Sequence, residues 1–372
     1  MSMRRREFLV AAGAGVVTGP QLVSARVRGA NERLNIGAIG VGGRGASDLA
    51  AVAGENIVAL CDVDADRLGV AAKKHPKAET YSDYRMLLDR KDLDAVVVAT
   101  PDHHHAVATM RALRRGLHVY CEKPLTHTVH EARLLAKEAA RQKVATQMGT
   151  QNHEHPGYLR LVELLETDAV GPIREAHIIT DRPGRFWPQG VALPSDRPKI
   201  PSNLAWDLWL GPAQERPYHP AYHPFKWRGF WDFGTGAVGD MGCHNSDLAY
   251  WSLDLRNPTT LSAESSDNNP ETAPKWSVIT YHFPKQGKRK PVKVVWYDGG
   301  KKPDPALAGQ KSLPGNGSIL IGSKDSLYIP MYWGKGTFLS GATEVDHKDV
   351  PETIKKPADF NRHHYLEWID AC

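Results

Sequence analysis

The stretch LNIGAIGVGGRGASDLAAVAG, residues 34–54, decides the fold. Its apolar start, LNIGAI, predicts a short buried strand that runs directly into a glycine turn, in which Gly40, Gly42 and Gly45 show the spacing G-x-G-x-x-G. The remainder predicts a helix. The apolar run NIVALCD comes next and places Asp62 at the end of a second strand, 22 residues after Gly40.

This order of strand, glycine turn, helix, strand and acid is what a dinucleotide site requires. Glycines allow the tight turn and a close approach of the backbone to a pyrophosphate, the helix N-terminus faces that pyrophosphate, and a carboxylate meets the ribose hydroxyls. Asp62 would repel a 2′-phosphate and therefore favours NAD over NADP, although Arg67 nearby keeps this preference moderate. The cofactor contacts expected from the turn are those of Gly40, Gly42, Gly43, Arg44 and Gly45.

The alternation of strands and helices continues as far as residue 149. The apolar runs LDAVVVAT, LHVYCE and KVATQMG predict strands, and the stretches between them predict helices. Near-continuous apolar strands separated by helices indicate a doubly wound parallel sheet with both faces covered. Ligands bind beyond the carboxyl ends of such strands, which is where Thr100, Pro101 and Lys123 lie. Position alone leaves Lys123 open between a functional group and an ordinary solvated loop lysine.

Composition indicates a globular protein. The chain has 372 residues, enough for two domains, and 41% of them are hydrophobic and 24% charged. The net charge of +5 comes partly from Arg4, Arg5 and Arg6, and elsewhere basic and acidic residues are interspersed. We therefore expect no nucleic acid partner.

Cysteines and histidines do not form a metal pattern. The four cysteines are far apart and make no C-x-x-C pair, so neither a zinc site nor a disulfide framework is expected. DHHHA and NHEH suggest metal ligands, but cysteine or carboxylate partners at ligand spacing are lacking. The sequence predicts no metal.

The N-terminus has the pattern of an export signal. A cationic start, a mildly apolar stretch and the sequence LVSA, suited to cleavage after Ala25, succeed one another within residues 1–30. The stretch is too short and too weakly apolar for a stable membrane span. RREFL, residues 5–9, is similar to the twin-arginine signal, although Arg4 stands where that signal usually has Ser or Thr. The alternative is a disordered basic tail.

Four motifs together carry a family resemblance. GVGGRG, CDVD, ATPDHHHA and HVYCEKPL, in this order and at these spacings, resemble the Gfo/Idh/MocA family, the group of glucose-fructose oxidoreductase and inositol dehydrogenase. They cover most of residues 34–127, and with the export signal the chain resembles the secreted bacterial branch of that family. The resemblance implies a Rossmann cofactor domain followed by an α+β domain with an open, mostly antiparallel sheet.

The resemblance also implies roles for the E-K-P motif. In the family this lysine lies beside the nicotinamide and the substrate, often with a cis Lys-Pro bond, which makes Lys123 a catalytic or substrate-orienting residue and Glu122 a helper near the nicotinamide. We expect positive charge and desolvation to lower the pKa of Lys123. Within the ATPDHHHA motif, Thr100, Pro101 and His105 are expected at the cofactor.

The family's second signature is an Asp and a His four residues apart, which GDMGCHNSD supplies as Asp240 and His244, with Asp247 further on. If Asp240 opens a helix, these side chains share one face. A carboxylate beside an imidazole raises its proton affinity, so His244 could take a proton from a substrate hydroxyl. Without the resemblance, the residues fit more simply an N-cap at Asp240 and a packed, polar His244.

The second domain begins near residue 153. PIREAHIITD, WSVITYHF, PVKVVWYD and GSILIGSKDSLYIP predict its strands. Between Pro183 and Gly234 lies a long stretch rich in proline and aromatic residues, whose flat faces suit sugar rings, although about half of its tryptophans are expected to pack the loop on the sheet. Tyr222, Trp231 and Asp247 are the expected substrate contacts.

The domain boundaries expected are a signal and linker at 1–30, a cofactor domain at 31–152 and a substrate and oligomerisation domain at 153–372. Members of this branch normally continue past HHYLEWIDAC with a helix and a segment that returns to the cofactor domain, whereas this sequence ends at Cys372. The sequence is therefore either a fragment or differently packed at its end. A homo-oligomer is implied by the family alone.

The expected function is an NAD-dependent oxidoreductase acting on a sugar, polyol or glycoside, exported to the periplasm or secreted by the twin-arginine machinery, and free of the membrane once mature. Little free NAD is available outside the cytoplasm. An exported enzyme would therefore favour a redox-neutral cycle, so the alternative is an NAD-dependent glycosidase or epimerase. A non-catalytic sugar- or nucleotide-binding protein is a further alternative.

Overall fold

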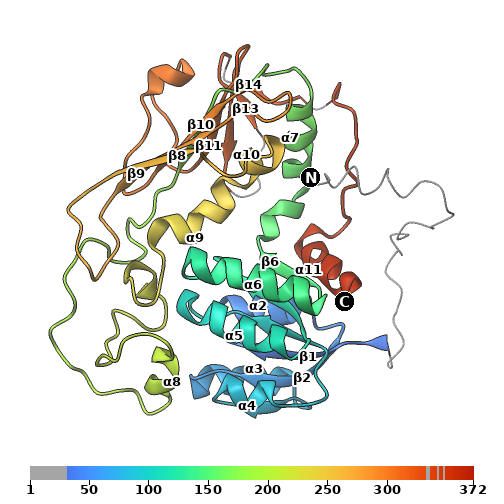
Figure 1. Ribbon diagram of the computed structural model, residues 1–372, viewed down its shortest axis with the longest axis vertical. Helices are drawn as coiled ribbons and strands as arrows, with labels where there is room; N and C mark the ends of the chain where they lie inside the picture. Colours follow the sequence, from blue (N-terminus) through green and yellow to red (C-terminus); the bar gives the residue numbers. More distant parts are fainter. Residues whose placement is uncertain (1–31, 332–335, 342, 347) are drawn as a thin grey trace. The chain divides into compact units, whose positions relative to one another are not determined.

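The first sheet is parallel and has the strand order β3-β2-β1-β4-β5-β6 (Figure 1). Its strands are β1 (Asn35–Ile39), β2 (Asn56–Cys61), β3 (Glu79–Tyr81), β4 (Ala95–Val98), β5 (His118–Glu122) and β6 (Thr146–Gly149). The helices between them are α2 (Arg44–Ala51), α3 (Ala65–Lys74), α4 (Tyr84–Leu88), α5 (Asp102–Arg114) and α6 (Val129–Gln142). This confirms the predicted Rossmann-type sheet.

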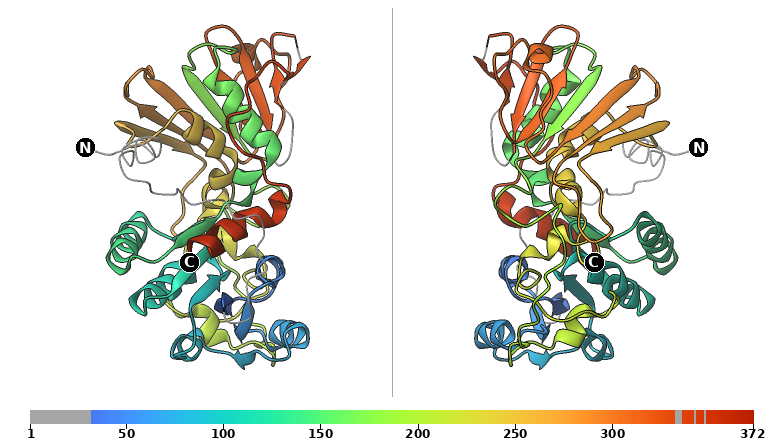
Figure 2. Two further views of the ribbon diagram at one scale, coloured as in Figure 1. Left: turned by 90° about the vertical axis from the view of Figure 1, so that its right-hand side faces the viewer. Right: turned by 90° about the vertical axis from the view of Figure 1, so that its left-hand side faces the viewer.

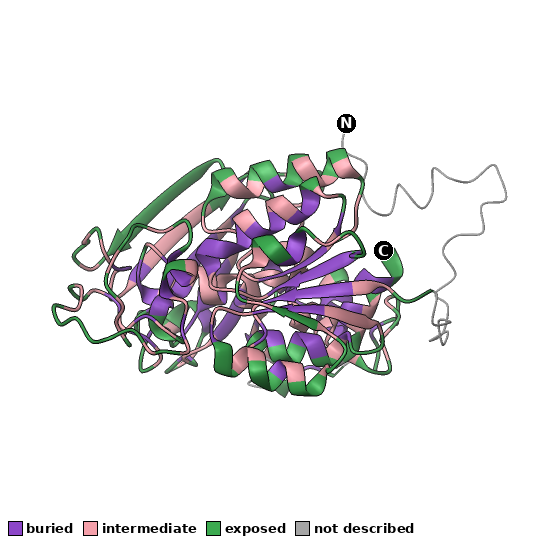
Figure 3. Cartoon of the chain, turned by 90° about the horizontal axis from the view of Figure 1, so that it is seen from below, coloured by how far each residue is buried: buried purple, intermediate pink, exposed green. Residues whose placement is uncertain are grey.

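Apolar side chains on alternate sides of the strands explain why both faces of this sheet are covered. In β4, Val96 and Val98 belong to the cluster that also holds α5, whereas Ala95 and Val97 belong to a cluster on the other face. All four residues of β4 are buried. Figure 3 shows buried residues along the central strands and exposed residues on the outer sides of the helices. A strand buried on both faces needs such an unbroken apolar run.

The computed structural model describes residues 32–331, 336–341, 343–346 and 348–372, with only the backbone of Asn361. The predicted export signal at 1–30 lies outside the described residues. None of the helices within the described ranges is long and apolar enough to cross a membrane.

The second sheet has the strand order β14-β13-β12-β11-β7-β10-β9-β8, and its pairs are antiparallel except β7 with β10. Its strands are β7 (Glu175–Ile179), β8 (Thr260–Ser265), β9 (Ser277–Phe283), β10 (Val292–Tyr297), β11 (Gly317–Ile321), β12 (Ser326–Pro330), β13 (Thr337–Phe338) and β14 (Thr343–Glu344). The four predicted strand runs correspond to β7, β9, β10 and the hairpin of β11 and β12. The prediction of a mostly antiparallel second sheet is therefore confirmed.

Three helices pack against one face of the second sheet. They are α7 (Pro156–Glu166), α9 (Gly236–Asn245) and α10 (Asp247–Ser252). Leu161, Leu164, Met241 and Leu248 from these helices form one apolar core with residues of the strands, such as Ile178. This packing holds α9 at the end of the sheet that is nearer the first domain (Figure 1).

The stretch between Pro183 and Gly234 builds a small core of its own. It contains α8 (Trp206–Leu210) and the short helix η3 (Lys226–Gly229). Trp206 and Trp209 stack with ring centroids 4.7 Å apart, and Tyr222, Phe230 and Phe233 complete the cluster. The backbone N–H of Ala205 donates to the carbonyl of Val63, so this loop is joined to the first domain.

The last helix, α11 (Phe360–Ala371), corrects the expected domain boundary. Residues 153–372 were assigned to one domain, but Tyr365, Trp368 and Ile369 pack on Ile36 and Tyr120 of the first sheet. Figure 2 shows α11, in red, beside this sheet. The spacing of three and four residues places these side chains on one face of the helix, and burying that face brings the helix back to the first domain.

Buried histidines should make the fold sensitive to acid. Burial lowers the pKa of His104 and of His364 to about 4, from an ordinary 6.5. As the pH falls below 6.5, the unfolded chain therefore binds protons at these histidines before the folded protein does. The free energy of unfolding that the neutral histidines contribute is fully present above pH 6.5 and is lost by about pH 4. The loss amounts to ~3 kcal/mol for each histidine. We expect the free energy of unfolding in urea to fall markedly between pH 7 and pH 4.5.

The matched pair for this test is His104→Gln and His130→Gln, because His130 is exposed. The first substitution should reduce the pH dependence of the unfolding free energy, and the second should leave it unchanged. Equal slopes for the wild type and His104→Gln would contradict the assignment of this effect to His104.

Candidate active site

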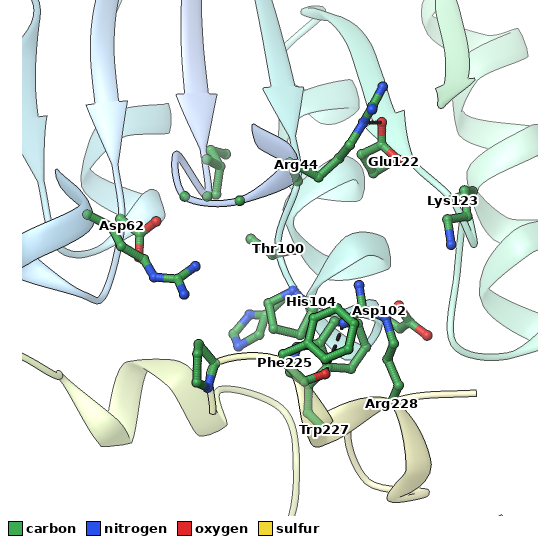
Figure 4. Close-up of a pocket in the computed structure, with 18 of the residues that line it drawn as sticks. Arg44, Asp62, Thr100, Asp102, His104, Glu122, Lys123, Phe225, Trp227 and Arg228 are labelled. Atoms are coloured by element: carbon green, nitrogen blue, oxygen red, sulfur yellow. Dashed lines mark hydrogen bonds and ion pairs between the residues drawn. The ribbon is translucent and has the colours of Figure 1, made fainter. Parts of the chain in front are cut away.

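A pocket of about 1120 Å³ opens between the first sheet and the second domain (Figure 4). It is lined by the glycine turn, the carboxyl ends of β2, β4 and β5, the loop before η3, and parts of α9 and α11. The predicted site residues that line it are Gly40, Gly42, Gly43, Arg44, Asp62, Thr100, Pro101, Glu122, Lys123, Asp240 and His244.

The glycine turn has the geometry that close backbone approach requires. Gly40 has φ +83°, and a Cβ added there would lie 2.7 Å from the carbonyl oxygen of Ala99. A Cβ on Gly45 would lie 1.9 Å from the carbonyl oxygen of Gly40. Neither position admits a side chain, so the turn brings its backbone and the start of α2 to the wall of the pocket, as a pyrophosphate site needs.

Asp62 stands at the end of β2 and holds the turn in place. Its Oδ2 accepts a hydrogen bond from the N–H of Val41 at 2.9 Å, and its Oδ1 accepts one from the N–H of Asp64 at 3.0 Å. Burial raises the pKa of this carboxyl. Arg67 lies across the turn, because a Cβ on Gly42 would come within 2.6 Å of its Cδ and Nη1. An acid and a cation therefore both line this end of the pocket.

Arg44 was predicted as a cofactor contact, and its guanidinium is engaged within the protein. Its Nε lies 3.1 Å from Asp48 Oδ1 and 3.3 Å from Glu122 Oε1, and its Nη2 donates to the hydroxyl of Tyr365 at 2.7 Å. Burial and the charge of Glu122 raise the pKa of Asp48 to about 8. Arg44 thus ties the glycine turn to β5 and to α11.

Lys123 and Asp240 meet across the two domains. Lys123 Nζ donates to the carbonyl oxygen of Asp240 at 2.7 Å and to its Oδ1 at 2.9 Å, and the Lys123–Pro124 bond is cis. Burial acts to lower the pKa of Lys123, but the charge of Asp240 outweighs it and raises the pKa. The prediction of a lowered pKa is therefore wrong, because it left out this ion pair.

His244 lies one turn beyond Asp240 on α9 and lines the same pocket. Burial and the positive charge of Lys123 lower its pKa to about 3, and the opposite effect of Asp240 is smaller. The expectation that the carboxylate raises the proton affinity is corrected, since the imidazole is neutral at ordinary pH. Asp240 is also not an N-cap, because α9 begins at Gly236.

Four other predicted residues lie away from the pocket lining. Tyr222 is buried in the aromatic cluster of the loop. Trp231 is 37% exposed, and its backbone N–H donates to the carbonyl oxygen of Glu271. Asp247 begins α10 instead of continuing α9, and its Oδ2 lies 2.9 Å from Nδ1 of His153. Gly45 lies behind Gly40. The substrate contacts expected of Tyr222, Trp231 and Asp247 are thus not supported by their positions.

His105 also lies behind the lining and links two of its loops. Its Nε2 is 2.8 Å from the carbonyl oxygen of Thr100, and its Nδ1 is 2.6 Å from that of Pro124. Burial acts to lower the pKa of His105, but Cys121 and Asp102 nearby raise it to about 10. Two carbonyl acceptors require that both ring nitrogens carry protons. His105 positions Thr100 and Pro124 instead of contacting the pocket itself.

Sequence reasoning missed Arg228. Its Nε lies 3.1 Å from Oδ1 of Asp240, and its guanidinium stacks on the rings of Phe225 and Trp227, each at 4.3 Å. All three side chains line the pocket and are labelled in Figure 4. The signal for this residue was the arginine within the aromatic stretch HPFKWRGFW.

The histidines of DHHHA do not gather into a metal centre. The ring nitrogens of His103 approach the carbonyl oxygens of Phe233 and Trp209, and Nε2 of His104 approaches that of Trp209 as well. One group of metal-ligand type is found among the described residues, namely Glu154, His363 and Glu367, and it does not line the pocket. Glu367 is exposed, and exposed acidic groups of this kind are common without a bound ion.

Two family models match this chain. Residues 34–150 match the Gfo/Idh/MocA model described as an oxidoreductase family with an NAD-binding Rossmann fold, and residues 185–304 match the model of the family's C-terminal alpha/beta domain. Together these matches cover the whole first sheet, the aromatic loop from residue 185 onward, and strands β8, β9 and β10 of the second sheet.

Curated relatives match part of this chain. Inositol 2-dehydrogenase of Salmonella typhimurium is 31% identical over 144 residues, which are 37% of this chain and 43% of the relative. A glycosyl hydrolase family 109 protein of Saccharopolyspora erythraea is 43% identical over 114 residues, 27% of this chain and 25% of that protein. The matches thus span less than half of each relative.

Among solved structures, an oxidoreductase domain protein from Kribbella flavida matches with a TM-score of 0.61 and 22% identity, covering 91% of this chain and 89% of that chain. This likeness concerns the fold of both domains.

Gly45 offers a test of the site geometry. An alanine here would bring its Cβ within 1.9 Å of the Gly40 carbonyl, so we expect Gly45→Ala to lower the free energy of unfolding by about 1–3 kcal/mol and to weaken NAD binding. Gly69→Ala is the control, because nothing lies within 4 Å of the added Cβ in helix α3, and it should be neutral or stabilising by up to about 1 kcal/mol. Denaturation in urea and calorimetric titration with NAD measure both effects, and tight NAD binding by a stable Gly45→Ala variant would contradict this geometry.

Proposed function

Because this chain belongs to the Gfo/Idh/MocA family of oxidoreductases, we propose that it transfers hydride between a hydroxyl-bearing carbon of a sugar, polyol or glycoside and a nicotinamide dinucleotide held in the pocket. One observation carries the proposal. The ammonium group of Lys123 and the carboxylate of Asp240, from separate domains, meet in the pocket that the glycine turn lines, with His244 beside them.

The residues present fit NAD. The glycine turn would hold the pyrophosphate against the start of α2, and Asp62 would face the adenosine ribose. Thr100 and Pro101, at the end of β4, would lie on the way to Lys123. The bound nicotinamide would supply the hydride acceptor. Asp62 favours NAD over NADP, and Arg67 beside the turn keeps this preference moderate.

Lys123 would act as a cation that orients the substrate oxygen. Its raised pKa keeps it protonated at neutral pH, so it can donate a hydrogen bond to the reacting hydroxyl and stabilise the negative charge that develops there. Asp240 holds the ammonium group in position through two contacts. Lys123 would therefore act through its charge, and another residue would remove the proton.

His244 would receive the proton of that hydroxyl. Its imidazole is neutral because burial and Lys123 lower its pKa, so a ring nitrogen has a lone pair to accept the proton. Transfer of the proton to His244 becomes more favourable as the hydride leaves the carbon, because the hydroxyl oxygen then loses electron density and its proton becomes more acidic. The aromatic walls formed by Trp187, Phe225 and Trp227 would cover the faces of a sugar ring.

Substitution of Lys123 tests the proposal. With NAD and a panel of sugars and polyols that includes myo-inositol, we expect Lys123→Met to lower kcat/KM at least about 100-fold, measured by the absorbance of NADH. Lys91→Met is the control on the exposed surface of the same domain and should retain full activity. A Lys123→Met variant with full activity would contradict the role given to Lys123, whereas a wild type that binds NAD and sugars without turnover would favour the non-catalytic alternative.

A redox-neutral glycosidase or epimerase is the second candidate. The 43% identity to a glycosyl hydrolase family 109 protein favours it, and so does the scarcity of free NAD outside the cytoplasm. In such a cycle the sugar hydroxyl is oxidised and the ketone acidifies the adjacent C–H bond. Loss of that proton then allows either elimination of the glycosidic oxygen as the free alcohol, followed by addition of water to the double bond, or epimerisation by return of a proton to the opposite face. The hydride is finally returned to the sugar. Atoms and electrons balance without an external oxidant.

Purified protein incubated with glycosides and no added NAD separates the two candidates. Multiple turnovers, followed by mass spectrometry of the products, are expected if the cofactor is recycled within the enzyme. A strict requirement for added NAD, with NADH formed in equal amount to the product, would exclude the internal cycle and support simple dehydrogenation.

Export and assembly are further parts of the proposal. The twin-arginine pattern RREFL supports delivery to the periplasm or outside the cell by that machinery. All six residues of β8, at the edge of the second sheet, are exposed, which supports homo-oligomer formation through this sheet. Cell fractionation and the molecular mass in solution test these two proposals.

A further inference from the structure

The pocket around Lys123 holds more cations than anions. Lys123, Arg182 and Arg228 all line it, and the first and last of these contact one carboxylate oxygen, Oδ1 of Asp240. The other two acids nearby are already neutralised, since Glu122 is paired with Arg44, and Asp102 lies beside the doubly protonated His105. Arg182 is paired with Asp181. One positive charge is therefore left without a counter-charge.

Arg228 carries that charge in a fixed position. Its guanidinium is stacked on Phe225 and Trp227, its Nε points to Asp240, and its Nη1 donates to the carbonyl oxygen of Phe225 at 2.9 Å. Its Nη2 has no hydrogen bond to any of the described residues, and the side chain is only 22% exposed. A planar guanidinium that is already held in place loses little freedom when it binds an anion.

The acids beside Arg228 are shared with other cations, Asp240 with Lys123 and Asp102 with His105. His244 is neutral, because burial and the charge of Lys123 lower its pKa. Charges on the wall of a partly buried pocket interact more strongly than charges in bulk water. A neutral sugar ring would leave this positive field unbalanced, whereas a carboxylate or a phosphate would balance it.

We infer that the carbohydrate bound in this pocket carries an anionic group, a carboxylate or a phosphate, and that the guanidinium of Arg228 binds it. This inference rests on the proposed function, and it adds the class of substrate. Arg228 is then a specificity-determining residue. Its stacking on two aromatic rings sets the direction in which the anionic group must lie relative to Lys123 and His244, which would act on the reacting hydroxyl.

Calorimetric titration of the NADH-loaded protein tests the inference without turnover. The probes are D-glucose, D-glucuronate and D-glucose 6-phosphate, together with D-galactose and D-galacturonate. We expect at least one acid to bind about tenfold or more tightly than its neutral counterpart, and the preference to shrink as the salt concentration rises. Comparison of the dissociation constants of glucuronate and glucose 6-phosphate shows whether the site prefers a carboxylate or a phosphate.

Arg228→Gln should weaken binding of the preferred acid by about 10- to 100-fold and change binding of the matched neutral sugar less than about threefold. Arg185→Gln is the control, because Arg185 lies in the same loop, is exposed and does not line the pocket. Circular dichroism melting of each variant verifies that it folds.

Equal affinities for the acids and the neutral sugars in the wild type would overturn the inference, and so would a failure of every acid to bind. An equal effect of Arg228→Gln on both members of a pair would overturn the role of Arg228. These outcomes are distinct from a failure of the proposed function. NADH formation from neutral sugars alone would preserve the function and overturn the inference, whereas acid binding without hydride transfer would do the reverse.

Discussion

The contact of Lys123 with Asp240 is the interaction on which the site depends. Both side chains are largely withdrawn from water, with 14% and 13% of their surfaces exposed, so neither charge is well hydrated and each is stabilised by the other. The pair joins the end of β5 to the middle of α9. It thereby links the two domains at the pocket and keeps the lysine protonated, and burial together with this lysine makes a protonated His244 unfavourable.

A second network ties the glycine turn to the end of the chain. Arg44 bridges Asp48, Glu122 and the hydroxyl of Tyr365, and Tyr365 in turn donates to Asp48 at 2.7 Å. Two buried carboxylates beside one guanidinium cannot both be fully compensated, which is why the pKa of Asp48 is raised. Helix α11 therefore forms part of the pocket wall, although more than 300 residues separate it from the turn.

The aromatic loop serves both as a core and as a wall. Trp206 stacks on Trp209 within the cluster, whereas Trp187 and Trp227 line the pocket as well as being buried. The expectation that half of these tryptophans pack the loop describes this division well, but proximity in the sequence could not say which residues would face the pocket. Arg228 is joined to the same cluster through Trp227, which belongs to it, whereas Phe225 contacts Trp187 edge-on.

The sequence by itself determined the first sheet, the glycine turn with Asp62, the place of Lys123 and the position of Asp240 and His244 one helical turn apart. Periodicity, glycine spacing and family motifs are local patterns, and the features that they predict are local as well. Tertiary structure decided the protonation of Lys123 and His244, the burial of Tyr222, the return of α11 and the charge of the pocket. Those properties arise from side chains that lie far apart along the chain and meet only when it folds, because burial and Coulomb energy depend on distance in space.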